Sequence, residues 1–537
     1  MPAYNGVCIP EWLNIAGYTV DCHVRAGRGD LVAIYYEDEQ ITFRELQEAA
    51  NRFGNALLGL GVKQGDHFLT LLHNRPETLI AILGGMKIGA IPVPVSTLYR
   101  ARDLEAVVLN SDAVALVTSP EHLLIYEQVQ GRVSLPHLIV VDAPGGGGLD
   151  FRRLVGEASP ELETADTRWD DPAFMFYTSG TTGTPKGVEH THCWGLWWGG
   201  PMNTNLMQTG PGDIVYMAQE LSFSFPFGSL FVFPFLTATS VVLAPGRFDA
   251  IRNFEILSRY RVTHFCTVPT QLRMMLAVPD AERRYDLSAL TYVLTAGETL
   301  PREVFAEWTR RFGIEPVDEL GQSECHGFVA NIRGLKKRPG SMGIPLPPHI
   351  VCVLDDEGRE CPPGQVGHLV IKADEPGLCR GYRKQPEEWA KVNRGGWYYT
   401  RDLATVDGDG YFWYVARSDD IIVSRGYLVS PKEVEDSLGE HPAVFEPAVV
   451  GSPDPVMGQK VKAFIRLRPG HAASDGLAEE IMAFVRTRIA PYKAPREVAF
   501  VEEIPKTLTG KIKRKELRDA EERAGGAAAG LSRRAQS

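Results

Sequence analysis

The strongest chemical signal in the sequence is a loop rich in glycine, serine and threonine that ends at a lysine. Residues 177–192 read YTSGTTGTPKGVEHTH and follow directly on the apolar run 173–176. Glycines let backbone N–H groups come close to an anion, hydroxyl groups add donors, and Lys186 supplies a positive charge. The pattern predicts a phosphate-binding loop made of Thr178, Ser179, Gly180, Thr181, Thr182, Gly183 and Lys186.

Two widespread phosphate-binding patterns do not match this loop. Its spacing is G-x-x-G-x-x-K-G, whereas P-loop NTPases have G-x-x-x-x-G-K-[ST] and dinucleotide-binding folds have G-x-G-x-x-G. A phosphotransferase of the P-loop type is therefore disfavoured. A flexible linker is disfavoured as well, because a linker would not need this ordered set of residues directly behind a buried strand.

Five further segments follow the loop. They are TAGE (295–298), ELGQSE (319–324), YYTRD (398–402), ARSDDIIVSRGYLVSPKEVE (416–435) and PKTLTGKIKRKELR (505–518). Together with the loop they resemble, in order, the motifs of the adenylate-forming superfamily of acyl-CoA synthetases, peptide-synthetase adenylation domains and firefly luciferase. The resemblance covers about residues 30–518. The segments 268–277 and 430–435, and the spacing after Glu324, look most like benzoate–CoA ligases and medium-chain acyl-CoA synthetases.

The resemblance implies a two-step reaction that uses Mg·ATP and coenzyme A. A carboxylate attacks the α-phosphorus of ATP, which gives an acyl-adenylate and pyrophosphate, and a thiol then displaces AMP. In this family a small C-terminal domain turns between the two steps, so the fold has two catalytic arrangements. The acceptor is expected to be free coenzyme A, and a stand-alone enzyme that loads a carrier protein is the alternative.

The resemblance also assigns roles to single residues. Lys511 matches the lysine that bridges the carboxylate and the α-phosphate, Glu324 matches the Mg²⁺ ligand, and Asp419 matches the hinge. Asp402 should accept hydrogen bonds from the ribose, with Arg417 close by. Thr178 is assigned a catalytic role. The adenine and ATP contacts are expected from Ala296, Gly297, Glu298, Glu319, Leu320, Gly321, Gln322 and Ser323.

Other interpretations of these residues exist. On composition alone, Lys511 would be one more solvated lysine in a basic tail, and Glu324 an exposed loop residue. A catalytically silent nucleotide-binding protein is disfavoured because Lys186, Glu324, Asp402 and Lys511 are all present. The chain departs from the family pattern at four positions: Ser323 replaces Thr, Arg401 and Ala416 replace Gly, and Val423 replaces Lys or Asn.

The acyl pocket is expected to involve residues 221–228, the TAGE turn and the segment after Glu324. Phe223, Phe225 and Phe227 alternate and could share one face of a strand, or could simply be core aromatics. His326 could contact a substituent of the substrate or only a core carbonyl. No cation is evident for a second carboxylate, so we expect an aromatic, alicyclic or short-to-medium-chain monocarboxylate. The expected pocket residues are Ser222, Phe223, Phe227, Gly297, Cys325 and His326.

These residues need a large α/β framework. Apolar runs alternate with helical patterns from about residue 40 to 330, which predicts parallel sheets with helices on both faces. A capping box of Thr42 and Glu45 starts a helix over 43–60, and Ser430 and Glu433 cap another. We expect an N-terminal domain over 1–417 with a β-rich part at about 339–417, a small mobile α+β lid over 418–520, and a disordered tail over 521–537.

Composition narrows the class further. The 537 residues carry 56 basic and 67 acidic side chains, a net charge of −11, which argues against a nucleic-acid binder. The eight cysteines show no CxxC and the thirteen histidines no HxxxH, so neither a zinc motif nor a disulfide framework is expected. No signal peptide is evident, and free thiols fit the cytoplasm. The uncharged run 221–246 is broken by prolines, so no membrane span is expected; a homodimer is left open.

Overall fold

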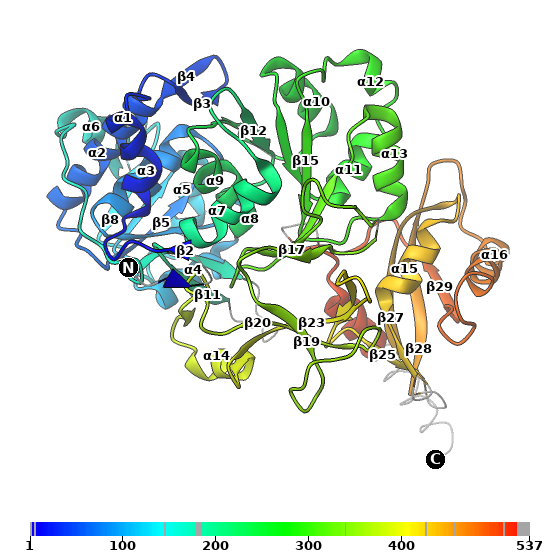
Figure 1. The fold of residues 1–537 in the computed structure, drawn as a ribbon. Helices are drawn as coiled ribbons and strands as arrows, with labels where there is room; N and C mark the ends of the chain where they lie inside the picture. Colours follow the sequence, from blue (N-terminus) through cyan, green and yellow to red (C-terminus); the bar gives the residue numbers. More distant parts are fainter. Residues whose placement is uncertain are drawn as a thin grey trace.

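The computed structural model describes residues 3–4, 7–143, 147–178, 185–338, 340–424, 427–454, 458–507 and 511–523 (Figure 1). A short hairpin (β1, Ala3–Tyr4; β2, Val7–Cys8) comes first. A π-helical turn and a helical turn follow (η1, Gly17–Asp21; α1, Cys22–Arg25).

The first sheet has five parallel strands in the order β6-β5-β7-β8-β9. The strands are β5 (His67–Leu71), β6 (Ile91–Pro94), β7 (Ala115–Thr118), β8 (His137–Val140) and β9 (Leu149–Asp150). Its helices are α2 (Phe43–Gly59), α3 (Pro76–Lys87), α4 (Ala101–Ser111), α5 (Pro120–Glu127) and α6 (Phe151–Glu157). The predicted capping box of Thr42 and Glu45 starts α2. Strands β5, β6 and β7 are buried along their whole length, as helices on both faces require.

The second sheet has nine strands in the order β18-β17-β16-β15-β14-β12-β13-β3-β4. They are β3 (Val32–Tyr36), β4 (Glu39–Thr42), β12 (Ile214–Met217), β13 (Ser240–Leu243), β14 (His264–Thr267), β15 (Tyr292–Ala296), β16 (Val317–Gly321), β17 (Gly327–Ala330) and β18 (Ile344–Pro345). The six strands from β16 to β3 are parallel, and β4, β17 and β18 are antiparallel additions at the edges. Helices α10 (Ala250–Arg259), α11 (Pro269–Leu276), α12 (Ala281–Arg284) and α13 (Arg302–Phe312) accompany it. The expected pair of parallel α/β sheets is confirmed.

The uncharged segment 221–246 folds as short helical turns and a strand. Its elements are α8 (Ser224–Phe227), the π-helical turn η4 (Gly228–Val232), α9 (Phe233–Leu236) and β13. Of the two interpretations left open for the alternating phenylalanines, the shared strand face is wrong, because a helical turn begins at Ser224, and Phe227 is a core aromatic. Upstream lie η2 (Gly195–Gly199), α7 (Gly200–Met202) and η3 (Asn203–Met207). Among the described residues, no helix is long and apolar enough to cross a membrane.

Two antiparallel sheets close the base of the large part. One contains β10 (Pro172–Thr178), β11 (Lys186–Thr191) and β21 (Gly381–Tyr382). The other contains β19 (Val351–Leu354), β20 (Gly367–Lys372), β22 (Asn393–Arg394), β23 (Trp397–Val406) and β24 (Phe412–Arg417). Helix α14 (Pro386–Val392) lies between β21 and β22 in the chain.

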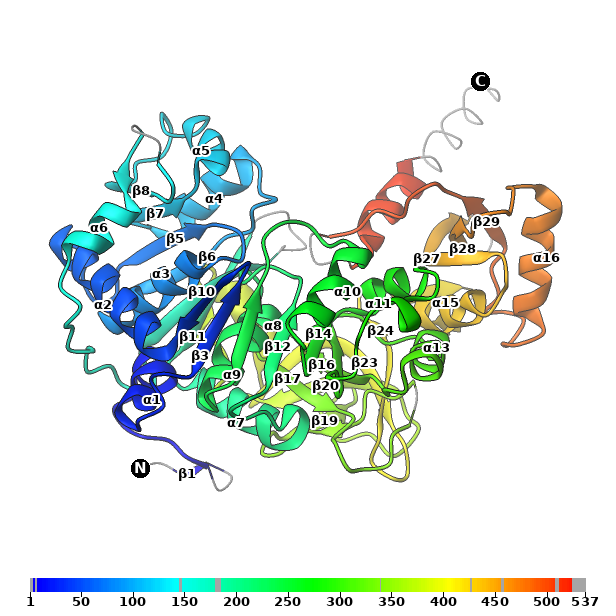
Figure 2. The ribbon, with the colours of Figure 1, turned by 90° about the horizontal axis from the view of Figure 1, so that it is seen from above.

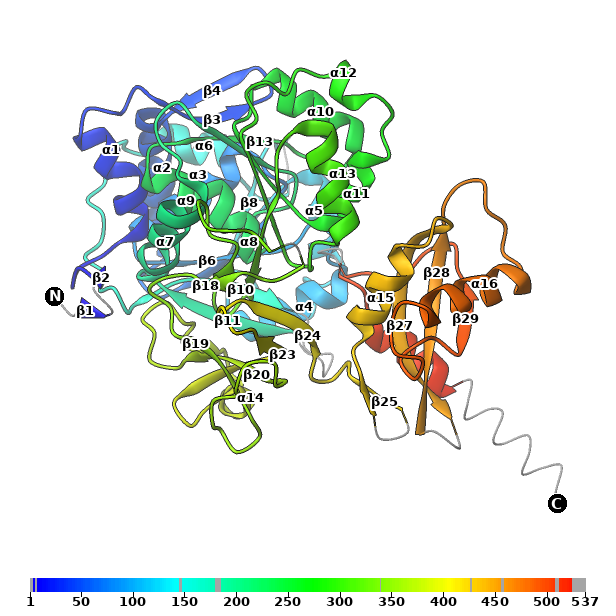
Figure 3. The same cartoon turned by 45° about the vertical axis from the view of Figure 1, so that its right-hand side comes forward.

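The C-terminal part forms a separate small unit beside the second sheet (Figures 2 and 3). Its sheet has the order β26-β25-β28-β27, with β29 beside β28. The elements are β25 (Ile422–Ser424), β26 (Tyr427–Val429), α15 (Pro431–Gly439), β27 (Val444–Asp454), β28 (Gly458–Leu467), α16 (Asp475–Arg486) and β29 (Glu497–Phe500). The Ser430 side chain accepts a hydrogen bond from the Glu433 N–H, which confirms the predicted cap.

The expected tail starts later than the sequence suggested. Residues 521–523 are still helical, and the Glu521 carboxylate accepts hydrogen bonds from Ser452 at 2.8 Å and Lys462 at 2.9 Å. The charged side chain ties the end of this helix to β27 and β28, which the Ala/Gly-rich composition could not reveal. Residues 524–537 lie outside the described residues.

Candidate functional site

The candidate site lies at the carboxyl ends of β15 and β16, where ligands of parallel sheets commonly bind. The two strands pair in parallel, with Ala296 beside Glu319. Gly297 follows with a φ of +85°, a conformation that favours glycine. A Cβ atom at this position would lie 3.9 Å from Cε of Lys511. The bare backbone of Gly297 and the side chain of Lys511 therefore face each other across a gap of van der Waals size.

Asp402 is joined to the end of β16 through Gln322. It lies on β23 opposite Arg417 on β24, and its carboxylate accepts hydrogen bonds from Gln322 Nε2 at 2.6 Å and Arg417 Nη1 at 3.3 Å. The side chain is 3% exposed, and this burial raises the pKa of the carboxyl, although Arg417 and Lys511 oppose the rise. The structure thus holds a buried acceptor in one orientation, as recognition of a ribose hydroxyl requires.

Gln322 acts here as a support for Asp402. Its amide also donates to the Thr400 carbonyl at 2.8 Å and accepts from the Tyr398 hydroxyl at 2.9 Å. Its side chain is therefore engaged with the β-rich part, whereas the sequence suggested a nucleotide contact. Leu320 and Gly321 end β16 beside it, and a Cβ at Gly321 would lie 2.8 Å from the His326 carbonyl, so only glycine fits there.

Glu324 lies on the opposite side of the same loop. It is half-buried, and its Oε1 atom accepts a hydrogen bond from the Tyr382 hydroxyl at 2.6 Å. The phenol fixes one carboxylate oxygen and so directs the other. A half-exposed carboxylate is the kind of ligand that Mg²⁺ takes together with water and phosphate oxygens. The residue therefore fits the metal that ATP chemistry requires.

Lys186 lies near Glu324, because both side chains contact Tyr382. It pairs with Thr178 across β10 and β11, and its Nζ lies 4.6 Å from the centre of the Tyr382 ring and 3.7 Å from Glu388 Oε2. Burial and the charge of Arg401 lower the pKa of this lysine. A lysine that is poorly solvated gains most from an anionic ligand. Ser179, Gly180, Thr181, Thr182 and Gly183 lie outside the described residues.

Lys511 belongs to the small C-terminal unit, and its side chain reaches Gly297 at the end of β15. Thr507 holds the base of its loop: the Thr507 N–H donates to the Lys511 carbonyl at 2.7 Å, and the Lys511 N–H donates to the Thr507 hydroxyl at 3.1 Å. Desolvation lowers the pKa of Lys511, and Arg417 lowers it further, whereas Asp402, Glu298 and Glu324 oppose this. The charges that act on the ammonium are therefore the ones that the sequence assigned to the same site.

Glu446 of the small unit makes one ion pair with the large part and another with the segment that leads to Lys511. The Glu446 carboxylate, 5% exposed on β27, lies 2.7 Å from Lys506 Nζ and 4.0 Å from Arg273 Nη1. Arg273 on α11 also lies 3.6 Å from Glu303 on α13. Glu446 therefore links the large part to the residue five positions before Lys511. Nearby, the Glu298 carboxyl accepts from the Thr270 hydroxyl at 2.8 Å, and burial raises its pKa.

The expected acyl-pocket residues separate into two groups. Phe227 and Cys325 are fully buried, and Phe227 packs within 4.7 Å and 5.0 Å, between ring centres, of Phe174 and Phe176, so these two belong to the core. Phe223, by contrast, is half-buried, and Ser222 donates a hydrogen bond to Glu220 at 3.3 Å. This loop leads directly to Gly228, which approaches His326.

His326 is the polar residue of this region. Its ring lies 4.7 Å from Phe233, 5.4 Å from Trp194 and 6.2 Å from Phe225, between ring centres. Within the described part of the chain, neither ring nitrogen has a hydrogen-bond partner, and burial lowers the pKa of the imidazole to about 3. His326 is thus a neutral ring with two unused polar atoms, which a ligand could satisfy.

Burial raises the pKa of two other carboxyls of this region. Desolvation raises the pKa of Asp318 to about 7 and that of Glu319 to about 8. The side chain of Glu319 packs against Gly327, where an added Cβ would lie 2.4 Å from Oε2. Only the backbone of Glu319 is therefore at the strand end where the sequence placed a nucleotide contact.

Sequence reasoning missed Tyr382 and the detailed role of Arg401. Tyr382 lies on β21, which pairs with β11, and it contacts both Glu324 and Lys186. No motif marks it. Arg401 has a φ of +64°, the conformation for which a glycine at this position is suited. Asp419 lies beyond the end of β24, with its carboxylate 4.0 Å from Arg417. The Ser323 carbonyl accepts a hydrogen bond from His190 Nε2 at 2.7 Å.

Comparisons with known proteins agree with this geometry. Residues 23–383 match the family model of AMP-binding enzymes, and residues 433–511 match that of the AMP-binding enzyme C-terminal domain. A benzoate–CoA ligase of Thauera aromatica is 36% identical over 517 residues, which cover 95% of this chain and 97% of that protein. An uncharacterised acyl–CoA ligase of Bacillus subtilis is 37% identical over 504 residues, or 92% of this chain and 94% of that one.

Solved structures give the same result. An anthranilate CoA ligase in complex with anthranoyl-AMP superposes with a TM-score of 0.90 at 34% identity, covering 96% of this chain and 99% of that one. A benzoate CoA ligase from Burkholderia xenovorans superposes with a TM-score of 0.87 at 33% identity, covering 94% of this chain and 99% of that one.

Proposed function

The chain belongs to the AMP-binding enzyme family, and from that premise we propose that it is an ATP-dependent carboxylic acid–CoA ligase. In the first step, a carboxylate oxygen bonds to the α-phosphorus of ATP and pyrophosphate leaves. In the second step, the thiol sulfur of coenzyme A bonds to the acyl carbon, AMP leaves, and the thiol proton is released. The observation that carries this proposal is that Lys511 lies close enough to Asp402, Glu324 and the backbone of Gly297 for the two carboxylates to act on its charge and for its side chain to border the strand end.

Each of these residues has a physical task in the first step. The acid and the α-phosphate are both anionic, so a cation must offset their repulsion as they approach. We assign this task to Lys511, whose pKa is lowered by desolvation and by the charge of Arg417, and whose charge is favoured by Asp402, Glu298 and Glu324. Asp402 accepts hydrogen bonds from the ribose, and the backbone at Ala296 and Gly297 borders the adenine.

The phosphate end of the site is assigned to Thr178, Lys186 and Glu324. Lys186 and the loop after Thr178 would hold the β- and γ-phosphates, and Glu324 would hold Mg²⁺, which supplies charge neutralisation when bound. Tyr382 orients both groups through its hydroxyl and its ring. Asp419 is proposed as the hinge between the parts 1–417 and 418–520, which lets the lysine loop leave before the thiol arrives.

For the acid, we propose an aromatic or other compact apolar monocarboxylate. Segment 221–246 carries no charge, and the imidazole of His326 is neutral because burial holds its pKa at about 3. No cation of this segment is therefore at hand for a second carboxylate. The relatives named above act on benzoate and anthranilate, which agrees with this class.

The free state of all eight cysteines supports a reducing, cytoplasmic setting.

The test is one incubation with Mg·ATP, coenzyme A and a pool of mono- and dicarboxylic acids, followed by mass spectrometry. We expect AMP, pyrophosphate and one dominant aromatic or apolar acyl-CoA. An acyl-adenylate without a thioester would instead indicate a carrier protein as the acceptor. ADP as the nucleotide product would overturn the proposed mechanism.

A further inference from the structure

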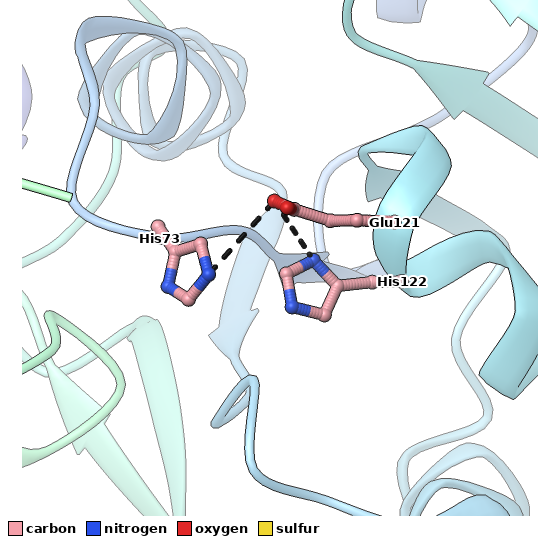
Figure 4. A group of neighbouring side chains, drawn as sticks. All are labelled: His73, Glu121 and His122. Atoms are coloured by element: carbon pink, nitrogen blue, oxygen red, sulfur yellow. Dashed lines mark ion pairs between the residues drawn. The ribbon is translucent and has the colours of Figure 1, made fainter. Parts of the chain in front are cut away.

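A second group of chemically capable side chains lies at the carboxyl edge of the first sheet. His73 follows β5, and Glu121 and His122 lie in the first turn of α5, directly after β7 (Figure 4). Strands β5 and β7 are parallel neighbours, so the segments that follow them meet at the same edge of the sheet. The three side chains point toward one another, and none of them belongs to the cleft described above.

The ligand atoms of this group lie within about 1.5 Å of the spacing of a tetrahedral coordination shell. Glu121 Oε1 lies 3.8 Å from His73 Nε2 and 3.5 Å from His122 Nδ1, and all three ligand atoms lie within 4.8 Å of one another. Bonds of about 2.0–2.2 Å in a tetrahedral site separate ligand atoms by roughly 3.3 Å. Side-chain rotations of a few tenths of an ångström to about 1.5 Å would therefore close the shell.

The other ring nitrogen of His73 has a carboxylate partner. Its Nδ1 lies 3.6 Å from Glu220 Oε1 and 3.4 Å from the hydroxyl oxygen of Thr97, and that hydroxyl donates a hydrogen bond to the same carboxylate. Glu220 is in turn fixed by hydrogen bonds from the Ser96 hydroxyl at 2.9 Å and the Thr97 N–H at 3.2 Å. A carboxylate behind a histidine is how proteins orient an imidazole toward a metal ion. This independent feature is absent from a simple surface ion pair.

The surrounding charge does not oppose a cation. Arg75 is the nearest positive group that acts on His73, and its guanidinium is neutralised by Glu77 at 2.7 Å and Asp142 at 2.8 Å. Glu121 is exposed, which leaves a side of the group open to solvent. A water molecule can therefore complete the shell.

We propose that His73, Glu121 and His122 bind one divalent transition-metal ion of the Zn²⁺ class, with water as the fourth ligand. Two imidazole nitrogens and one carboxylate oxygen suit Zn²⁺ and its transition-metal neighbours, whereas Mg²⁺ and Ca²⁺ prefer oxygen ligands only. The site is separate from the Mg²⁺ position at Glu324. Glu220, which follows β12 and also accepts from Ser222, links the metal group to the second sheet and to the loop of the acyl region.

The test is equilibrium binding of ZnCl₂ to the full chain after removal of metal with a chelator, read by calorimetry and by metal analysis after dialysis. We expect one Zn²⁺ per chain, and loss of this binding in His73→Ala and in His122→Ala. Glu220→Gln should weaken affinity by about 10- to 100-fold, as other outer partners of metal-bound histidines do. Zn²⁺ should also raise the melting temperature of the wild-type chain and not that of the two histidine variants.

Three controls keep the outcome decisive. His471→Ala removes an exposed histidine elsewhere and should bind Zn²⁺ as the wild type does. Glu324→Gln should also bind it, which separates this site from the Mg²⁺ position. His73→Gln keeps the size of the side chain should His73→Ala fail to fold. The proposal is overturned if the stoichiometry or affinity is the same in wild type and in His73→Gln and His122→Ala, or if the wild type binds no Zn²⁺.

Discussion

Asp402 and Lys511 belong to one candidate site, where the charge of each acts on the other, and the chain holds them in different ways. Asp402 is buried in a β-sheet, paired with Arg417 across two strands and fixed by Gln322. Lys511 sits on a loop of the small unit, and that loop is tied to the large part by the ion pairs of Glu446. One half of the site is thus built into a sheet of the large part, and the other half comes from a loop of the small unit. This difference suits a reaction in which the nucleotide stays bound while the lysine is needed only once.

Loss of Asp402, the residue held in the sheet, should slow both half-reactions. In Asp402→Ala, the ribose loses its acceptor and the Arg417 guanidinium, 35% exposed, loses its carboxylate partner. Truncating one member of a buried, hydrogen-bonded charge pair costs roughly 2–5 kcal/mol, and because Arg417 is partly solvated we expect the lower end, about 2–3 kcal/mol or roughly 30- to 160-fold. We expect a loss of this size in acid-dependent ATP–pyrophosphate exchange and in thioester formation from added acyl-adenylate. Asp356→Ala, at an exposed residue of the same β-rich part, is the matched control, and a loss in only one half-reaction would contradict the assignment.

Loosening the support should damage the first half-reaction alone. Glu446→Gln removes the charge that holds Lys506 and Arg273, and a hydrogen bond to a charged group contributes about 1.5–3 kcal/mol. We expect adenylation to slow by roughly 10- to 100-fold, with thioester formation unchanged or faster. Glu433→Gln breaks an ion pair with Lys493 inside the small unit and should leave both steps intact. Equal slowing of both steps in Glu446→Gln would show that the ion pair does not act on domain arrangement.

The pH dependence should also separate the two sides. The ammonium of Lys511 must be protonated to bridge two anions, and its pKa is lowered from 10.5 by desolvation and by Arg417. The alkaline fall of kcat/KM for adenylation should therefore begin below pH 10.5. In Lys511→Arg, whose guanidinium keeps its proton, the residual adenylation activity should lack this fall. An unchanged profile would assign the titration to another group.

The smallest effect is expected where the chain departs from its family. Arg401 adopts a φ of +64°, which costs a non-glycine residue roughly 1–2 kcal/mol. A glycine would relieve this strain, but it would also make the unfolded chain more flexible, which cancels part of the gain in stability. Arg401→Gly should raise the free energy of unfolding by up to about 1 kcal/mol, measured by urea denaturation. Arg401→Ala keeps the strained backbone and should show no such gain. A destabilised Arg401→Gly would mean that the guanidinium itself supports the site.

Local signals were enough to predict much of the fold. The capping box at Thr42 and Glu45 and the cap at Ser430 depend on hydrogen bonds within three residues, and both form as expected. The apolar runs gave the two parallel sheets, because strands buried on both faces must be apolar along their length. The segment around Phe223 and Phe227 was left undecided between a strand face and core aromatics, since alternating phenylalanines fit a strand and a short helical turn equally well.

Features made by distant residues could not be predicted. Tyr382 reaches Glu324 only because β21 pairs with β11, and nothing near Tyr382 in the sequence marks it. His73 and His122 are far apart in the chain and match no metal-binding spacing, yet adjacent strands bring the segments that carry them to one edge of a sheet. The motif of Lys511 named the residue, but its distance from Gly297 depends on how the small unit sits.

The central claim is that Lys511 is needed for adenylation and not for thioester formation. Its most direct test is Lys511→Ala, assayed in the two half-reactions separately. We predict that acid-dependent ATP–pyrophosphate exchange falls by roughly 100- to 1,000-fold, the usual cost of one preorganised electrostatic contact. Thioester formation from preformed acyl-adenylate and coenzyme A should stay within a few-fold of wild type, and Lys513→Ala should change neither rate. Equal loss of both half-reactions in Lys511→Ala would contradict the account, because the lysine would then be needed throughout the reaction.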